Sequence, residues 1–206
     1  MAVNAEATGK TYPPFEYEVG KEKIREYAHA VGEDNPVYFD RAAASEAGFR
    51  DVVAPPMFAV IYSWGAVALP AVDPEVDLNF AMLVHGGQEF LWGEPVCSGD
   101  VISTVATVKD IHEKGGMGFY VFETVSTNQD GAEVARACVN GAGGDPRSLK
   151  RLSVQFRGMG FPEQEITVTG SLKEERDGRV IVETQAEQGG KRIIRNAEAE
   201  LEQSPQ

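Results

Sequence analysis

MFAVIYSWGAVAL, from Met57 to Leu69, is the stretch of sequence that decides the fold. Pro55-Pro56 precedes it and Pro70 follows it, so prolines mark both of its ends. The stretch is apolar nearly all round a helix, which is typical of a helix buried in protein rather than one on a surface. Its thirteen residues are too few to cross a bilayer, because a membrane span needs about 20. We therefore expect a buried helix that other elements must cover.

Three segments precede this helix. Residues 1–14 are expected to form an extended, partly mobile lead-in. Residues 16–31 carry apolar side chains at helical spacing, which predicts a short amphipathic helix. Asp40 is a suitable N-cap for a second short helix over 41–47, and Gly48 is a natural C-terminal stop.

Beyond residue 80 the composition becomes that of β-strands. Four segments are rich in Val, Ile, Thr, Phe and Tyr and are separated by Gly, Asn and Asp turns: Met82–Trp92, Asp100–Lys114, Met117–Thr127 and Ala132–Gly141. Four consecutive strands with short turns favour an antiparallel meander. A sheet that covers one buried helix gives an α+β architecture, the hot-dog fold, in which an antiparallel sheet wraps a central helix. We assign residues 15–144 to this domain.

The C-terminal part repeats the strand section. VHGGQEFLWGEPVCSGDVISTVATV, from Val84, is similar to LSVQFRGMGFPEQEITVTGSL, from Leu152, and the turn at 128–131 has a counterpart at 188–191. No counterpart of the helices precedes the second set, because the linker GAGGDPRS leads directly into strands. Residues 145–206 are therefore predicted to be a partial second hot-dog unit with strands only. These strands extend the first sheet, pair with a partner subunit, or belong to an internally shortened protein.

The composition excludes several classes of partner. The 206-residue chain has 19 Lys and Arg against 32 Asp and Glu, which gives a net charge of −13. Such a charge repels nucleic acid and anionic membrane surfaces. The N-terminus has neither the basic lead-in nor the apolar core of a secretory signal. Cys97 and Cys138 have no metal-ligand spacing and are expected to be reduced thiols of a cytoplasmic protein, and neither a metal nor a cofactor is expected.

The segment GEDNPVYFD, residues 32–40, carries a motif. It resembles the hydratase motif G-D-x-N-P-x-H of the MaoC-like (R)-specific enoyl-CoA hydratases and 3-hydroxyacyl dehydratases, which are hydro-lyases. Gly32, Asn35 and Pro36 match the motif. The resemblance implies a hot-dog fold and, as ligand, an acyl thioester of coenzyme A or of an acyl carrier protein.

The two catalytic positions of the motif depart from the family. Glu33 stands at the acid position and Tyr38 at the histidine position. In the family, the aspartate and histidine form a dyad that handles the water and the α-proton. An ordinary tyrosine has a pKa near 10, far from the range in which general acid–base catalysis is efficient near neutral pH. We therefore predict a vestigial dyad, although a buried carboxylate at Glu33 could be tuned to act as a base.

The resemblance extends beyond the motif. Residues 15–144 look like the N-terminal hot-dog of the FAS1-like dehydratase domains, through AGFRDVVAPPMFA (47–59) and LVHGGQEFLWGEPVCSGD (83–100). Residues 149–201 are similar to the C-terminal half of the family's catalytic hot-dog, through LKRLSVQFRGMGFP and RNAEAEL. By this comparison, the missing part is the one that would hold the catalytic helix and dyad. The resemblance implies a homodimer or a hetero-assembly with a catalytic hot-dog subunit.

Several residues are candidates for substrate binding. Asn35 is expected to hold its loop through bonds to the backbone. The missing side chains of Gly86 and Gly87, beside His85, let backbone amides approach a ligand, so they could hold a thioester oxyanion; the alternative is a strand bulge. The remaining candidates come from the central helix region, where they line an acyl tunnel or build the core: Pro56, Phe58 and Trp64.

Other polar residues leave alternatives open. Arg147, Lys150, Arg151 and Arg157 form the densest cationic run, which is either a patch for an anionic ligand or a solvated loop. His29 and His112 are expected on the surface without partners.

Three functions compete. The first is a dehydratase or hydratase, active alone or across an interface, and the second is a non-catalytic acyl-chain-binding subunit that shapes a partner's pocket. A hot-dog thioesterase would need a carboxylate on the central helix, and Met57 to Leu69 contains none. We favour membership in the dehydratase family with the dyad lost or supplied elsewhere.

Overall fold

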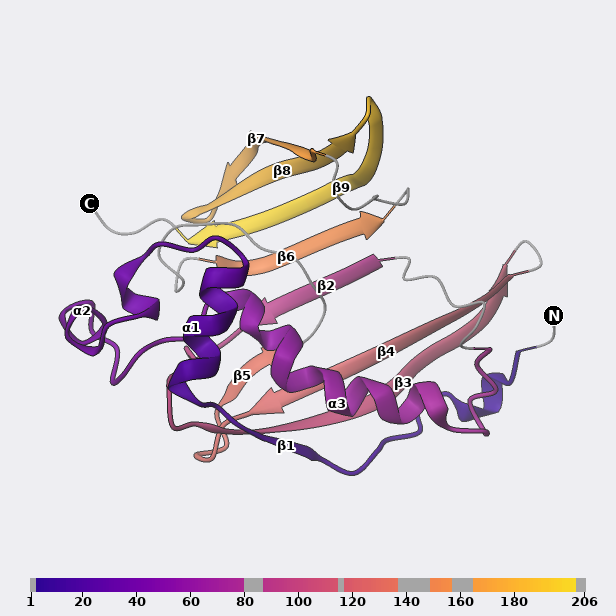
Figure 1. Ribbon diagram of the computed structural model, residues 1–206. Helices are drawn as coiled ribbons and strands as arrows, with labels where there is room; N and C mark the ends of the chain where they lie inside the picture. The colour runs from indigo at the N-terminus through magenta and orange to yellow at the C-terminus, as the bar shows by residue number, and fades with distance from the viewer. Residues whose placement is uncertain (1–2, 80–86, 115–116, 137–148, 157–164, 203–206) are drawn as a thin grey trace.

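One antiparallel sheet carries the fold, and a long helix lies on part of one of its faces (Figure 1). The computed structural model describes residues 3–79, 87–114, 117–136, 149–156 and 165–202, and in these ranges the sheet has nine strands. The predicted α+β class is confirmed. In the described part of the chain, no helix combines the length and hydropathy that a membrane span requires.

The described helices all precede the second strand. They are α1 (Lys21–Ala30), α2 (Arg41–Glu46) and α3 (Ala59–Val72), with 3-10 turns at Ala5–Ala7, Pro36–Tyr38 and Pro56–Phe58. The predicted signals for α2 are confirmed. The Asp40 side chain accepts a hydrogen bond from Ala43 N at 2.8 Å, and Gly48 adopts a φ of 85° just after the helix.

The strands are β1 (Phe15–Glu18), β2 (Gly87–Trp92), β3 (Val101–Lys114), β4 (Met117–Thr127), β5 (Glu133–Arg136), β6 (Leu149–Phe156), β7 (Thr167–Arg176), β8 (Arg179–Gln188) and β9 (Lys191–Glu202). Their order in the sheet is β1-β3-β4-β5-β2-β6-β9-β8-β7. Apart from β1, this order is symmetric about its centre, because β3-β4-β5-β2 is followed by β6-β9-β8-β7. The predicted repeat is therefore visible as an internal two-fold arrangement of strands. The predicted boundary at residues 144 and 145 lies outside the described residues.

The predicted meander is wrong for β2, which pairs with β5 and β6 rather than with β3. The connection from β2 to β3 is tied to the segment before α3. Ala54 N donates to Val96 O and Ser98 N donates to Val52 O, both at 2.8 Å. The connection held by these bonds runs past β5 and β4, which lie between β2 and β3 in the sheet. The pairing of β2 with β6 joins the two strand sets within one chain.

The first helix and the lead-in also differ from expectation. Residues 15–18 form strand β1, which pairs with β3, and the helix begins only at Lys21, because the alternating segment FEYE uses its backbone groups at the sheet edge. The lead-in is docked: Thr11 bridges Thr107, and Tyr12 Oη donates to Asp73 Oδ2 at 2.6 Å.

Helix α3 is buried on one side. Tyr62, Ala66 and Pro70 face the sheet, while Trp64 and Val72 are 69% and 74% exposed. The prediction that this helix is buried all round, with Trp64 in the core, is therefore wrong for the described residues, since the sheet covers one side. The helix also continues past Pro70 to Val72, because a proline this close to the end disrupts little of the helix.

Candidate functional site

A cavity of about 230 Å³ lies beside the N-terminal end of α3. Its walls come from elements far apart in the sequence: residues 53–56 before α3, residues 92–96 at the end of β2, Tyr62 of α3, Val134 of β5 and Lys150 of β6. It therefore lies close to the junction where the two strand sets meet.

Trp92 fixes one wall of the cavity. Its Nε1 donates a hydrogen bond to Pro56 O at 2.9 Å, and its ring packs on Phe90 with the centroids 4.9 Å apart. Gly93 follows, and a Cβ there would lie 2.1 Å from Glu133 O, so glycine lets the chain pass close to β5. The sequence analysis did not predict these two wall residues; the Gly-Glu-Pro that follows β2 was the available signal.

Tyr62 contributes a neutral hydroxyl to the site. Its side chain is buried, and burial raises the pKa of the phenol, so the group stays protonated near neutral pH. A neutral phenol is a hydrogen-bond donor and does not act as a base at that pH.

The charged residues at the cavity are Glu94 and Lys150. Lys150 Nζ pairs with Glu202 Oε2 at 2.8 Å, and this contact lowers the pKa of Glu202. Arg151 is also matched, because it lies 2.6 Å from Glu89 Oε1. The described members of the cationic run are thus paired with carboxylates, as expected of a solvated face. Arg147 and Arg157 lie outside the described residues.

The vestigial dyad positions lie in the turn after α1. Asn35 Oδ1 accepts a hydrogen bond from Val37 N at 3.2 Å and so caps the 3-10 turn that contains Tyr38. Tyr38 is only 2% exposed and belongs to an apolar cluster with Phe49 and Val53. Glu33 is partly exposed, and neither Glu33 nor Tyr38 is among the described residues that line the cavity. Tyr38 thus fills space next to Val53, which does line it.

The described histidines do not supply a dyad at the cavity. His112 Nδ1 lies 2.6 Å from Asp110 Oδ2, and its ring stacks on Phe119, so the prediction that His112 has no partner is wrong. However, both members of this pair are about half exposed on β3 and neither lines the cavity. His29 packs against Phe39.

The three predicted substrate-binding residues of the central helix region lie in three different environments. Pro56 lines the cavity, as described above. Phe58 is fully buried among the rings of Tyr17, Tyr27 and Tyr62, and Trp64 points to solvent. Neither Phe58 nor Trp64 lines this cavity.

The predicted Gly-Gly element is described only in part. Gly87 starts β2 and pairs with Gln155 of β6, and a Cβ on it would lie 3.2 Å from Val154 O. Its lack of a side chain therefore serves close strand packing. His85 and Gly86 lie outside the described residues.

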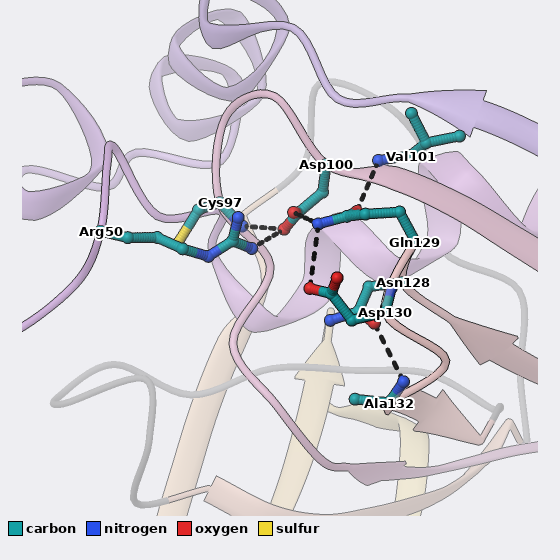
Figure 2. A network of polar contacts seen from close by, with 8 residues as sticks. All are labelled: Arg50, Cys97, Asp100, Val101, Asn128, Gln129, Asp130 and Ala132. Carbon is teal, nitrogen blue, oxygen red and sulfur yellow. Dashed lines mark hydrogen bonds and ion pairs between the residues drawn. The ribbon is translucent and has the colours of Figure 1, made fainter.

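A buried polar network holds the segment that forms the cavity wall (Figure 2). Asp100 is fully buried, and its carboxylate accepts hydrogen bonds from Cys97 N at 2.8 Å and from Gln129 Nε2 at 3.0 Å. It also forms an ion pair with Arg50, which raises the pKa of that guanidinium. Gln129 Oε1 in turn accepts from Val101 N at 3.1 Å.

The network joins three segments that are distant in sequence. Arg50 begins the stretch that continues into the wall at residues 53–56, while Asp100 belongs to the turn after the wall at 92–96. Gln129 lies in the turn between β4 and β5. The network therefore positions two walls of the cavity against each other, and its position suggests a supporting role rather than contact with a ligand.

The described side chains offer little redox or metal chemistry. Burial raises the pKa of the Cys97 thiol, which favours the unreactive protonated form. Among the described residues, no group of three or more His, Cys, Asp or Glu side chains is arranged to hold a metal ion.

Comparisons with known proteins agree with this fold. The model of the FAS1-like dehydratase domain region matches residues 6–137. A UPF0336 protein of Streptomyces avermitilis is 42% identical over 117 residues, which cover 56% of this chain and 78% of the relative.

Two solved structures are also similar. A MaoC-like dehydratase covers 96% of this chain and 99% of its own, with a TM-score of 0.84 and 17% identity, so it supports the hot-dog fold alone. The C-terminally truncated HadBC (3R-hydroxyacyl-ACP dehydratase) complex of Mycobacterium tuberculosis provides a chain with 30% identity and a TM-score of 0.56. That match covers 64% of this chain and 93% of the other.

Proposed function

The chain belongs to the family of the FAS1-like dehydratase domain region, and from this premise we propose that it binds an acyl thioester without having a catalytic dyad of its own. It would be a member of the MaoC-like family of 3-hydroxyacyl-thioester dehydratases and enoyl-thioester hydratases and would act in fatty acid metabolism in the cytoplasm. The observation that carries this proposal is the burial of Tyr38. The histidine position of the motif holds a phenol in an apolar cluster, and neither Glu33 nor a described histidine lines the cavity.

The cavity supports binding of part of the ligand. Its walls are mostly apolar, with Pro55, Pro56, Trp92 and Val134, and Tyr62 adds one hydroxyl. Apolar walls with a few placed polar groups are typical of small-molecule sites. A volume of about 230 Å³ is below the roughly 300–1,000 Å³ of pockets for drug-sized ligands. The cavity is therefore large enough for one end of an acyl thioester but not for the whole molecule.

A second candidate function is a non-catalytic subunit that shapes the acyl pocket of a dyad-bearing partner. The observation that favours it is the likeness to a chain of the HadBC complex, whose name describes an assembly of dehydratase subunits. In that arrangement a catalytic hot-dog subunit would supply the aspartate and histidine.

Hydration of crotonyl-CoA by the purified chain tests the missing dyad. We expect negligible turnover, because general acid–base catalysis contributes roughly 10²–10⁴-fold and both of its groups are replaced. The double change Glu33→Asp plus Tyr38→His should recover activity only in part, since burial at position 38 disfavours the charged imidazole. Turnover by the unmodified chain that Glu33→Gln abolishes would show that Glu33 is catalytic and the proposal wrong.

Calorimetric titration with acyl-CoA tests binding separately. We expect Trp92→Leu to weaken binding about tenfold, because it removes a cavity wall worth about 1.4 kcal/mol. Leu91→Ala is the matched control, since Leu91 is the preceding residue of β2, is 42% exposed and is not among the described residues that line the cavity. Equal affinities for both variants and the unmodified chain would exclude this cavity as the site.

A further inference from the structure

The sheet has an internal two-fold arrangement that the helix layer lacks. Strands β3 and β4 occupy the places that β7 and β8 occupy on the other side of the centre. Helix α3 lies against β1, β3 and β4, whereas among the described residues no helix packs extensively on β7 or β8 (Figure 1). In the part of the chain that the structure describes, one half of the sheet therefore has a helix packed on one face, and no helix packs extensively on β7 or β8 in the other half.

A row of paired residues shows which face is uncovered. Five residues on adjacent strands are paired in a row, so their side chains share one face: Phe90 of β2, Leu152 of β6, Ala199 of β9, Val182 of β8 and Leu172 of β7. Phe90 packs in the core with residues of α3 and is fully buried, and Leu152 is 2% exposed. Leu172, at the far end of the row, is 59% exposed. On the side of the sheet that carries α3, the apolar side chain at β7 is therefore exposed to solvent, whereas those at β2 and β6 are buried.

We name as the uncovered face the apolar side chains at this end of the sheet that are accessible to solvent: the exposed Val168 and Leu172 of β7 and the partly exposed Val182 of β8, the partner of Leu172. Ala186, the partner of Val168, is buried. Val168 is 67% exposed. None of these three residues carries a charge, in a chain whose net charge is −13. Exposed apolar patches of this kind mark interaction sites.

Helix α3 has a matching surface. Trp64, Ala68 and Val72 follow one another at i, i+4 and i+8, so they form a stripe on one side of the helix. This stripe is opposite Tyr62, Ala66 and Pro70, which face the sheet. Trp64 and Val72 are both more than two-thirds exposed, and no residue of α3 carries a charge.

We propose that two copies of this chain associate face to face, with the α3 stripe of each copy lying on the uncovered face of the other. The dimensions agree. The fourteen residues of α3 are about 21 Å long, and the ten-residue strands β7 and β8 are about 33 Å long. The four strands from β6 to β7 span about 14 Å, which is wide enough for one helix of about 10 Å diameter.

The occupant is a second copy because both unmatched surfaces belong to the same chain and the same side of the sheet. A two-fold axis between the two sheets brings both pairs of surfaces together at once, which is the self-complementary contact of an isologous dimer. Any partner with only one of these surfaces would leave the other exposed. Since the contact surfaces are uncharged while each chain is strongly negative, salt should strengthen the association by screening the repulsion.

Sedimentation velocity over a concentration series tests the proposal. We expect a dimer for the full chain, and a shift to monomer for Trp64→Lys and for Leu172→Lys, each lowering affinity at least tenfold. Both residues are well exposed, so the folded core tolerates the change. The control is Val121→Lys: Val121 is 41% exposed, and its neighbour Phe122 packs in the core, so Val121 points to the opposite face.

A crosslinking experiment is independent of variant stability. Trp64→Cys chains and Leu172→Cys chains are mixed and treated with a short bismaleimide, and we expect a covalent dimer in the mixture but little with either variant alone. Cys138 is replaced by Ser in both variants, because it is the other native cysteine, and Cys97 is buried and contributes little background.

Three outcomes would overturn the proposal: a monomer at every concentration, a dimer broken by Val121→Lys alone, or association that requires an added dyad-bearing subunit. The last would assign the uncovered face to that subunit. These results are distinguishable from failure of the proposed function, because acyl-CoA binding is measured in the cavity and does not depend on this surface.

Discussion

Replacing Asp100 by asparagine tests whether the buried network holds the cavity together. One oxygen of the carboxylate accepts from Cys97 N and pairs with Arg50, and the other accepts from Gln129 Nε2 (Figure 2). Asparagine has the same shape but has one acceptor, one donor and no charge. Whichever way the amide is turned, its NH₂ group then faces a donor.

The expected cost follows from the burial of each partner. Breaking one side of a buried ion pair costs about 3–5 kcal/mol, but the Arg50 side chain is 51% exposed and can be rehydrated, so the loss of the ion pair here costs less than that range. Leaving a buried donor such as Cys97 N unpaired costs about 1–3 kcal/mol. We expect a loss of about 2–3 kcal/mol in the free energy of unfolding. In a protein of this size that lowers Tm by about 4–12 °C.

Thermal and urea unfolding, followed by circular dichroism, measure this loss. The matched control is Asp130→Asn in the turn that carries Gln129, since its carboxylate is exposed and contacts Gln129 Nε2 only at 3.5 Å. That change should stay within about 0.5 kcal/mol. Below the melting range, Asp100→Asn should also weaken acyl-CoA binding more than Asp130→Asn does. An Asp100→Asn protein that unfolds together with the unmodified chain would refute the supporting role of the network.

Two further predictions concern other positions. Gly93→Ala should destabilise the protein by about 1–3 kcal/mol in urea unfolding, because its Cβ meets the backbone at Glu133, whereas Gly20→Ala, with open space around it, should cost a few tenths. The hydrogen bond from Lys10 lowers the pKa of Asp73 to about 2, whereas the carboxyl of an unfolded chain has a pKa of about 3.9. The ionised Asp73 therefore stabilises docking of the lead-in fully above pH 3.9, and this stabilisation is lost as the pH falls toward 2. Hydrogen exchange of the lead-in amides should show this loss, and Asp73→Asn should remove its pH dependence.

Features that depend on near neighbours were predictable from the sequence. The N-cap at Asp40 and the stop at Gly48 act within one turn of helix, so their chemistry alone places α2. The turn at 188–191 likewise connects β8 and β9 as predicted. The place of β2 in the sheet was not predictable, because it depends on bonds between segments 52–54 and 96–98 that no local pattern announces.

The burial of α3 shows a different limit. An apolar sequence all round a helix predicts that every side is covered, but it does not say by what. The chain covers the side of Tyr62 and Ala66 with its own sheet and leaves Trp64 exposed. The same sequence pattern is compatible with a second cover from the same chain or from another subunit. The prediction was wrong for the chain alone, and the proposed dimer would account for the pattern.

At the candidate site, the sequence identifies a change of residue type, but only the structure shows what the new residue does. A tyrosine at the histidine position is compatible with hydrogen bonding to a thioester, which needs a hydroxyl that reaches the ligand. Tyr38 is instead packed with Phe49 and Val53, and it is Val53 that lines the cavity. A buried aromatic ring supports the wall through dispersion contacts and burial of apolar area. Position 38 has therefore become part of the packing behind the site, which is why restoring histidine there should return only part of the activity.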